Sequence, residues 1–398
     1  MNRFALAAAA TIAATASAQA GGLDRSGQSI LALFDAPDTG AATLSWVNPS
    51  VTGSDTAAPT GATYDVGNSY SQVSLSFANE INDRVSYAVI VDQPFGADIF
   101  YNATPQTSLL GGTKADLGAE AVTVLGKYQF SDRVSAYGGV RVQRAGGEVA
   151  LNGQAYAQAI GTALEGRGIG TAGPNAADLL TPNGAGFTGY DVQIDESWGA
   201  GLVIGAAYEI PEIALRLAVT YNSKVTHSGD SVERFSVAAL GDGAPLAGQY
   251  SFQTPQSINI DFQTGINPKT LVLASLRWTE WGDFDVVPQN LNADLANIDD
   301  VYRWSVGVAR RFSDEFVGLA SVTYEKDNGS ATVSPLGPTD GQIGVNLGAR
   351  YDRGNLAVSG GINYTEVGDA FAGVGGNPVA LFSDNSVVGV GFKVAYKF

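Results

Sequence analysis

The chain of 398 residues contains no cysteine and a single histidine, His227. Without cysteine there are no disulfide bonds, so stability must come from packing and hydrogen bonds. With no thiolate and one imidazole, the usual ligands of a transition-metal site are missing, and we predict neither a metal nor another cofactor. Basic residues are also scarce. The chain has 22 Lys and Arg against 39 Asp and Glu, a net charge of −17, which argues against nucleic acid as a partner.

Long apolar runs are also lacking. Beyond the first 20 residues no stretch approaches the roughly 18 apolar residues that a spanning helix needs, which excludes a helical membrane protein. Residues 1–20 (MNRFALAAAATIAATASAQA) combine Arg3, an Ala-rich stretch and Ala18-Gln19-Ala20. This layout is typical of a secretory signal peptide cleaved after Ala20 or Ala18, the alternative being an N-terminal helix. We expect an exported chain that begins near Gly21.

The chain is rich in glycine and aromatic residues, with 50 Gly, 16 Tyr and 17 Phe, and its apolar residues alternate with small or polar ones. In the last twelve residues, VVGVGFKVAYKF, every second position from Val388 to Phe398 is apolar and the others are Gly, Ala or Lys. Alternation of this kind predicts a strand with two different faces, although a soluble β-sandwich would alternate as well. Together with the export signal, it favours an all-β fold, a transmembrane antiparallel β-barrel whose apolar face contacts lipid.

Six short polar turns join alternating segments, in SFANEINDRVSYAV, GKYQFSDRVSAYGG, AAYEIPEIALRL, FQTGINPKTLVLA, VARRFSDEFVGLA and GARYDRGNLAVSG. Longer polar stretches, such as 152–189 and 230–248, lie between them. Short turns at one end and long loops at the other are typical of outer-membrane barrels. Counting these segments predicts about fourteen strands, with the first between Val51 and Val66.

Aromatic residues gather where the strands meet the short turns: Tyr128, Phe130, Tyr208, Phe312, Tyr351, Tyr396 and Phe398. Such rings favour the headgroup level of a membrane, so we predict a periplasmic girdle here. The terminal Phe398 is similar to the signal that outer-membrane barrels present to their assembly machinery.

A barrel of fourteen strands is too wide for its own side chains to fill, because about eight strands already enclose a filled interior. Residues 21–50 mix small residues with Phe34, Leu44 and Trp46, and we predict that they form a plug, or hatch, inside the lumen. A flexible periplasmic tail is the alternative. The expected organisation is a signal peptide (1–20), a hatch (21–50) and a barrel with extracellular loops (51–398).

Over nearly the whole mature chain the sequence resembles the FadL/TodX family of outer-membrane transporters of long-chain fatty acids and other hydrophobic compounds. The resemblance is carried by the N-terminal segment ending in Asn48-Pro49-Ser50, by ADLGAEAVTVLGKYQF, and by a block with the spacing Trp278-x-x-Trp281-x-x-Phe284. The family's usual Asn-Pro-Ala is Asn-Pro-Ser here, and the first strand is weak. From the resemblance, Phe34, Trp46, Asn48 and Pro49 belong to the hatch.

The resemblance implies a monomer in the outer membrane of a Gram-negative bacterium. Its ligand, a long-chain fatty acid or another hydrophobic small molecule, is captured among the extracellular loops, passed to a lumen pocket and released sideways into membrane lipid through a gap beside a kinked strand. The strand that starts at Ala115 would flank this gap as the third strand, with Gly118 at the lateral gate.

Several cations fall on the predicted inner face and are candidates for binding a carboxylate head: Arg141, Lys224, Arg303 and Arg277, with Lys127 and Arg216 as further members. The alternative is that they balance lumen acids such as Asp195 and Asp261. For the apolar tail, a short helix from Ala155 presents Ile160 and Leu164, which Phe187 and Phe235 in the loops could join. A self-packed loop is the alternative.

Three other functions remain as alternatives: a lipase, a porin, and a structural or adhesive protein, against which the lack of repeats in the loops argues. A barrel lipase would use His227 with a serine, but the adjacent Ser228 points to the opposite face of a strand. A diffusion porin would have an open lumen, which the predicted plug opposes. The acidic run DLANIDD, ending at Asp300, could bind Ca²⁺ or simply solvate a loop.

Overall fold

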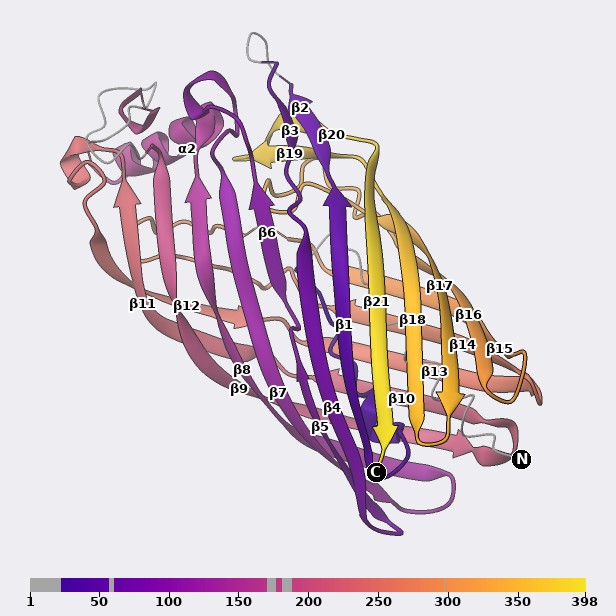
Figure 1. The fold of residues 1–398 in the computed structure, drawn as a ribbon. Helices are drawn as coiled ribbons and strands as arrows, with labels where there is room; N and C mark the ends of the chain where they lie inside the picture. Colours follow the sequence, from indigo (N-terminus) through magenta and orange to yellow (C-terminus); the bar gives the residue numbers. More distant parts are fainter. Residues whose placement is uncertain (1–22, 57–60, 170–176, 181–187, 297) are drawn as a thin grey trace.

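The chain forms a closed antiparallel barrel of fourteen strands, which confirms the predicted fold. The computed structural model describes residues 23–56, 61–169, 177–180, 188–296 and 298–398. The predicted signal peptide and Phe187 lie outside the described residues. Three wall strands are interrupted, so that the main sheet has seventeen segments. In Figure 1 helix α2 and a small sheet lie at one end of the wall and the C-terminus lies at the other.

In chain order the wall contains β1 (Thr39–Ser50), β4 (Tyr70–Asn82), β5 (Val85–Asp92) with β6 (Gly96–Phe100), β7 (Lys114–Gln129), β8 (Val134–Leu151), β9 (Tyr190–Ile210), β10 (Leu215–Asn222) with β11 (Val225–Phe235), β12 (Leu246–Thr254) with β13 (Ser257–Asn267), β14 (Thr270–Thr279), β15 (Val301–Arg311), β16 (Phe316–Glu325), β17 (Gln342–Arg353), β18 (Leu356–Val367) and β21 (Asn385–Lys397). The small sheet contains β2 (Thr52–Asp55), β3 (Thr63–Asp65), β19 (Ala370–Val374) and β20 (Asn377–Phe382).

The helical segments are α2 (Gly153–Gly166) and the 3₁₀ turns η2 (Leu31–Phe34), η3 (Pro105–Thr107), η4 (Ala177–Leu180), η5 (Pro211–Ile213) and η6 (Ala238–Leu240). Within the described ranges, none of the helices has the length and apolar character needed to cross a membrane.

The two faces of the wall follow the alternation in the sequence. Along β21, Val388, Val390 and Phe392 are exposed on the outside. Along β10, Arg216, Ala218 and Thr220 are buried inside the barrel, whereas Leu217 and Val219 are exposed. Because successive side chains of a strand point to opposite faces, the outer surface is an apolar band suited to lipid and the inner surface is largely polar.

All six predicted turns join neighbouring wall strands. The aromatic side chains next to them are exposed on the outside, and Tyr396 packs edge-on against Phe398 at 5.1 Å between ring centroids. The backbone N–H of Phe398 donates to the carbonyl of Asp38 at 2.8 Å. The last residue of the chain is therefore fixed beside the start of β1.

The boundary predicted between hatch and barrel is wrong. Residues 39–50 form β1, which pairs with β21 on one side and β4 on the other and so closes the barrel. Leu44 and Trp46 are exposed on its outer face, and Asn48 and Pro49 lie at its extracellular end. The first wall strand is thus β1 and not a segment between Val51 and Val66. Without β1, both neighbours would expose unpaired backbone groups to lipid.

The segment that does lie inside the lumen is residues 23–38, which we call the hatch from here on. Ile30 and Leu33 of the hatch are buried against a cluster on the inner wall: Ala78, Ala88, Ile90, Leu125, Tyr137, Val203, Ala207 and Ala218. Burial of side chains of this size contributes about 1.5–3 kcal/mol each. The Phe34 ring packs edge-to-face against Tyr137. The guanidinium carbon of Arg216 lies 4.3 Å from the centroid of the Phe34 ring. The hatch is therefore docked on one side of the barrel interior.

The strands β2, β3, β19 and β20 come from distant parts of the chain and form a cap beside α2 (Figure 1). Tyr64, Tyr101 and Phe382 form the buried aromatic centre of this cap. It covers part of the extracellular end of the lumen.

Candidate ligand site

Two adjoining apolar cavities lie in the lumen beside Leu23 of the hatch, with volumes of about 40 and 30 Å³. They share five lining residues, Leu23, Leu117, Ile194, Phe284 and Val286. The larger cavity is also lined by Phe95 and Trp281, whose rings meet edge-on with centroids 5.3 Å apart. The aromatic spacing Trp278-x-x-Trp281-x-x-Phe284 therefore places two of its three residues at an apolar site in the lumen.

The third wall strand is interrupted beside this site. The segment Gln93-Pro94-Phe95 separates β5 from β6, and proline lacks the N–H that a continuous strand would donate. Ladder pairing between β4 and β5 ends at Leu75 and Val91 and resumes at the bridge between Gly67 and Ile99; between them, the N–H of Val73 donates to the Gln93 side chain at 3.2 Å.

Within the described part of the chain, no hydrogen bond between two backbone groups joins residues 69–74 to residues 92–97. We call this break in the ladder the wall opening. On the lumen side of this opening, a cavity of about 110 Å³ lies between the hatch and β1, β4 and β5, and its lining includes Gln72, Val73, Asp92 and Gln93.

The hatch is attached to one edge of the wall opening. The N–H of Gly96 donates to the carbonyl of Leu23, and the N–H of Arg25 donates to the carbonyl of Pro94, each at 2.8 Å. The Arg25 guanidinium lies 4.3 Å from the ring centroid of Tyr70, on the other edge. Residues 23–25 therefore connect the two sides of the opening from within.

Arg277 holds the same end of the hatch from the opposite wall. Its guanidinium forms a two-pronged ion pair with Asp24, at 2.5 and 3.2 Å. It also donates to Ser257, Asn259 and Gln28. The two charged side chains are only 9% and 3% exposed. Breaking such a buried pair by removing one partner costs about 3–5 kcal/mol, because the other charge is left uncompensated.

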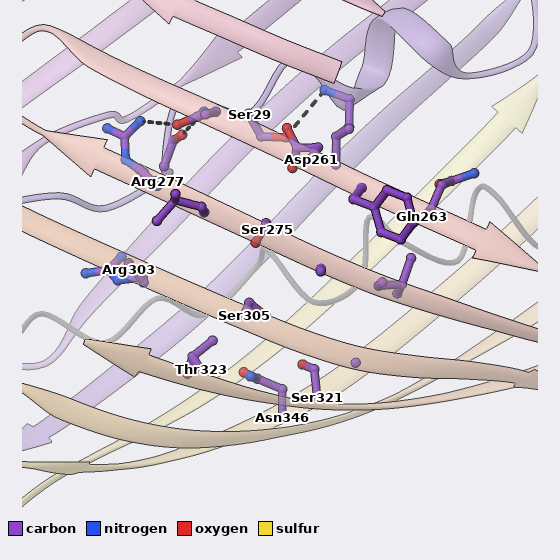
Figure 2. A pocket seen from close by; sticks show the side chains of 18 of the residues that line it. Ser29, Asp261, Gln263, Ser275, Arg277, Arg303, Ser305, Ser321, Thr323 and Asn346 are labelled. Carbon is purple, nitrogen blue, oxygen red and sulfur yellow. Dashed lines mark hydrogen bonds between the residues drawn. The ribbon is translucent and has the colours of Figure 1, made fainter. Parts of the chain in front are cut away.

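A larger cavity, of about 180 Å³, lies beside the hatch along β13 to β17. Figure 2 shows its wall of Ser275, Ser305, Ser321, Thr323 and Asn346, with Arg277 and Arg303 at one end and Gln263 at the other. Its lining also includes Leu31, Phe262, Leu273 and Leu276, so the cavity is of mixed polarity. The two upper cavities are more strongly apolar.

The other predicted cations all have protein partners. Arg141 is buried and donates to Thr123 and Asn222. Arg303 pairs with Glu325 at 3.1 Å. Lys224 lies at the break between β10 and β11 and pairs with Glu280 and Asp283 at 2.7 and 2.8 Å. Of the four candidates, only Arg277 contacts the hatch, and only Arg277 and Arg303 line a described cavity.

Helix α2 forms where a short helix was expected, and Ile160 and Leu164 lie on its buried face. They belong to the same apolar cluster as Phe235, Trp281 and Phe284. None of Ile160, Leu164 and Phe235 lines a described cavity. In this conformation these three side chains are packed in the apolar cluster that includes the cavity residues Trp281 and Phe284.

Gly118 lies on β7, which is the fourth wall strand and not the third as predicted. The strand is continuous there, and Gly118 pairs with Gly96 at the edge of the wall opening. The interruption itself was missed, although a proline within an alternating segment is a signal that could have revealed it.

His227 is buried, with its ring stacked on Phe252 at 5.2 Å and Nδ1 3.1 Å from the carbonyl oxygen of Ser197. Ser228 lies on the opposite face of β11, so the two side chains do not form a nucleophile and base.

The acidic loop uses its carboxylates to hold its own fold. Asp294 accepts the N–H groups of Val286 and Ala296, and Asp300 accepts those of Gly282 and of the Trp278 indole. Burial raises the pKa of Asp294, while the two backbone donors oppose this shift. No group of three or more possible metal-ligating side chains was found among the residues that the structure describes.

Comparison with known families decides the identity. The model of a family described as "Outer membrane protein transport protein (OMPP1/FadL/TodX)" matches residues 4–398. The chain belongs to the FadL/TodX family. It is therefore an outer-membrane transporter and not an enzyme. A search of curated proteins gave no match.

Solved structures of similar fold agree with membership of the FadL/TodX family. A Pseudomonas aeruginosa FadL homologue superposes with a TM-score of 0.70 at 16% identity, covering 92% of each chain. The Pseudomonas putida toluene transporter TodX gives 0.64 at 15% identity over 96% of each chain. The Ralstonia pickettii toluene transporter TbuX gives 0.62 at 15% identity over 97% of each chain. At these identities the likeness concerns the fold.

Proposed function

We propose that this transporter carries hydrophobic small molecules, such as long-chain fatty acids or aromatic hydrocarbons, from the cell exterior into the outer membrane. The compound is captured beneath the extracellular cap, enters the apolar cavities and leaves sideways through the wall opening. The protein works as a monomer in a Gram-negative outer membrane, which it enters with the help of the assembly signal at Phe398.

The observation that carries this proposal is the position of Phe95 and Gly96. Both residues line the larger apolar cavity, and both lie at the interruption of the third wall strand. An apolar compound in this cavity is therefore next to a segment of the described wall where adjoining strands lack a hydrogen-bonded ladder, over residues 69–74 and 92–97.

A sideways exit also agrees with the energetics of the cargo. Moving an acyl chain into water costs about 0.8 kcal/mol per CH₂ group. The alternative path past the hatch leads along a cavity lined by hydroxyl, amide and charged groups. The lateral route ends in lipid, whereas the path along the lumen ends in water.

Closing the opening with a cross-link tests the route. Because the chain has no cysteine, Val73→Cys with Gln93→Cys creates the sole reactive pair, one residue on each edge. We expect a reducible bis-maleimide linker to lower uptake of radiolabelled oleate and toluene in cells that depend on this protein, and reduction to restore it.

The matched control is Val322→Cys with Val345→Cys, an outward-facing pair on β16 and β17, where the ladder is intact. Linking this pair should leave uptake unchanged. Full uptake through a protein cross-linked between residues 73 and 93 would rule out the lateral route, and comparison of the two compounds identifies the preferred cargo.

A further inference from the structure

The hatch dipeptide Leu23-Asp24 has the chemistry of an amphipathic acid. The Leu23 side chain lines both apolar cavities, and the neighbouring Asp24 presents its carboxylate to Arg277 in a two-pronged ion pair. An apolar group and a carboxylate thus lie side by side at the junction between the apolar cavities and the cavity of mixed polarity.

The wall around this junction is arranged for a carboxylate. Ser257 and Asn259 accept hydrogen bonds from the same guanidinium nitrogen, at 3.0 and 2.8 Å, and so fix the orientation of Arg277. Planar guanidinium groups bind carboxylates through two parallel hydrogen bonds. Arg277 is the guanidinium that pairs directly with this carboxylate, and the charges of Arg141 and Arg303 lie close enough to attract it as well.

Arg277 and Asn259 line the 180 Å³ cavity, and residues close to them in sequence line the larger apolar cavity. Trp281 lies four residues after Arg277 at the end of β14, and Thr254, which lines the larger apolar cavity, lies three residues before Ser257. A carboxylate bound to Arg277 could therefore extend its tail past the position of Leu23 to Phe95 and Trp281.

From this arrangement we propose that Arg277, with Ser257 and Asn259, is the head-group site for a hydrophobic monocarboxylate, and that Asp24 occupies it as an internal substitute for the ligand. This inference rests on the proposed function, because it assigns the head-group site of the same transport pathway. An incoming monocarboxylate displaces Asp24 from Arg277 and takes the place of Leu23 in the cavity, whereas a neutral hydrocarbon has no means of competing with Asp24.

The test compares dodecanoate with 1-dodecanol, which has the same chain and no charge. Binding of each radiolabelled compound is measured on the purified protein in non-ionic detergent, with protein-free micelles as background. Asp24→Asn removes the competing charge and leaves Arg277 unpaired. We expect Asp24→Asn to raise the affinity for dodecanoate about tenfold or more, which corresponds to the free energy of a charge-assisted hydrogen bond. The affinity for dodecanol should change by no more than about twofold.

Asp35→Asn is the matched control, since it removes one negative charge from the hatch at a residue with no hydrogen bond to Arg277 among those described. It should leave both affinities unchanged. An equal gain for dodecanoate in Asp35→Asn would show a general charge effect and overturn the inference. So would an Asp24→Asn protein that binds dodecanoate no better than wild type.

A second variant keeps the inference testable if the Asp24→Asn protein does not assemble. Asp24→Leu with Arg277→Met replaces both charges by apolar groups, an exchange that buried ion pairs often tolerate. This protein should lose any preference for dodecanoate over dodecanol; a retained preference overturns the inference. If wild type binds neither compound, the proposed function fails. If wild type binds dodecanol, but Asp24→Asn and the double variant bind dodecanoate with the same affinity, the inference alone fails.

Discussion

Side chains that bring together distant parts of the chain determine the candidate site. Asp24 and Arg277 are separated by 253 positions, and no local pattern in the sequence links them. Alternation did place Arg277 correctly on the inner face, because the phase of a strand is a local property. Its partner could not be predicted, because it depends on how the hatch lies within the closed barrel.

Filling the larger apolar cavity should reduce transport. Ala119 is buried and lines this cavity, so Ala119→Phe would occupy the space that the cargo needs. We expect affinity for the cargo to fall about tenfold, while overpacking costs about 1–3 kcal/mol of stability. Binding of radiolabelled dodecanol to the purified variant checks this. Ala320→Phe, on the lipid-facing side of β16, is the control and should bind normally.

Two glycines at the edge of the wall opening should respond differently to alanine. A Cβ on Gly96 would lie 2.6 Å from the Arg25 guanidinium carbon, whereas a Cβ on Gly118 would have no atom within 4 Å. Gly96→Ala should therefore push the flexible Arg25 side chain out of the opening and increase uptake about twofold, on the scale of a few tenths of a kcal/mol. Gly118→Ala should have no effect, and reduced uptake in Gly118→Ala would instead assign it a direct role in the gate.

Strands with a clear pattern and a close partner in the sequence were the predictable elements. The six hairpins and the lipid-facing residues of β10 and β21 were correct because their turns and alternation are local signals. The strand β1 was assigned to the hatch because Gly40-Ala41-Ala42 weakens its alternation and one of its partners, β21, is at the far end of the chain. The small extracellular sheet was missed for the same reason, since β2 pairs with β20.

The revised boundary between hatch and barrel predicts different outcomes for two deletions. Removing residues 23–36 leaves β1 intact, so the barrel should still close and resist trypsin in detergent. Removing residues 23–50 deletes β1 and leaves the edges of β21 and β4 unpaired, which lipid does not tolerate. This protein should be degraded or remain unassembled. Protease resistance and the heat-dependent shift in gel mobility measure both outcomes, and an assembled barrel lacking residues 39–50 would contradict the assignment of β1.

At the scale of the whole molecule, the hatch is the feature that distinguishes this transporter from a diffusion porin, which has an open lumen. Barrels wider than about eight strands enclose space that something must fill or that water enters. Here residues 23–38 pack on one inner side, and the two main cavities that remain beside them are about 180 and 110 Å³. The intact protein should therefore conduct ions weakly.

Single-channel recording in planar bilayers tests this difference on one barrel in two forms. We expect the intact protein to show only small or brief currents, because the hatch is held by Ile30 and Leu33 in the wall cluster and by the Arg277 ion pair. The protein lacking residues 23–36 should show a large and steady current, because the polar inner faces of β13 to β17 would then line a continuous aqueous lumen. An intact protein that conducts as well as the truncated one would mean that the hatch does not block the lumen, and the porin alternative would then explain the molecule better.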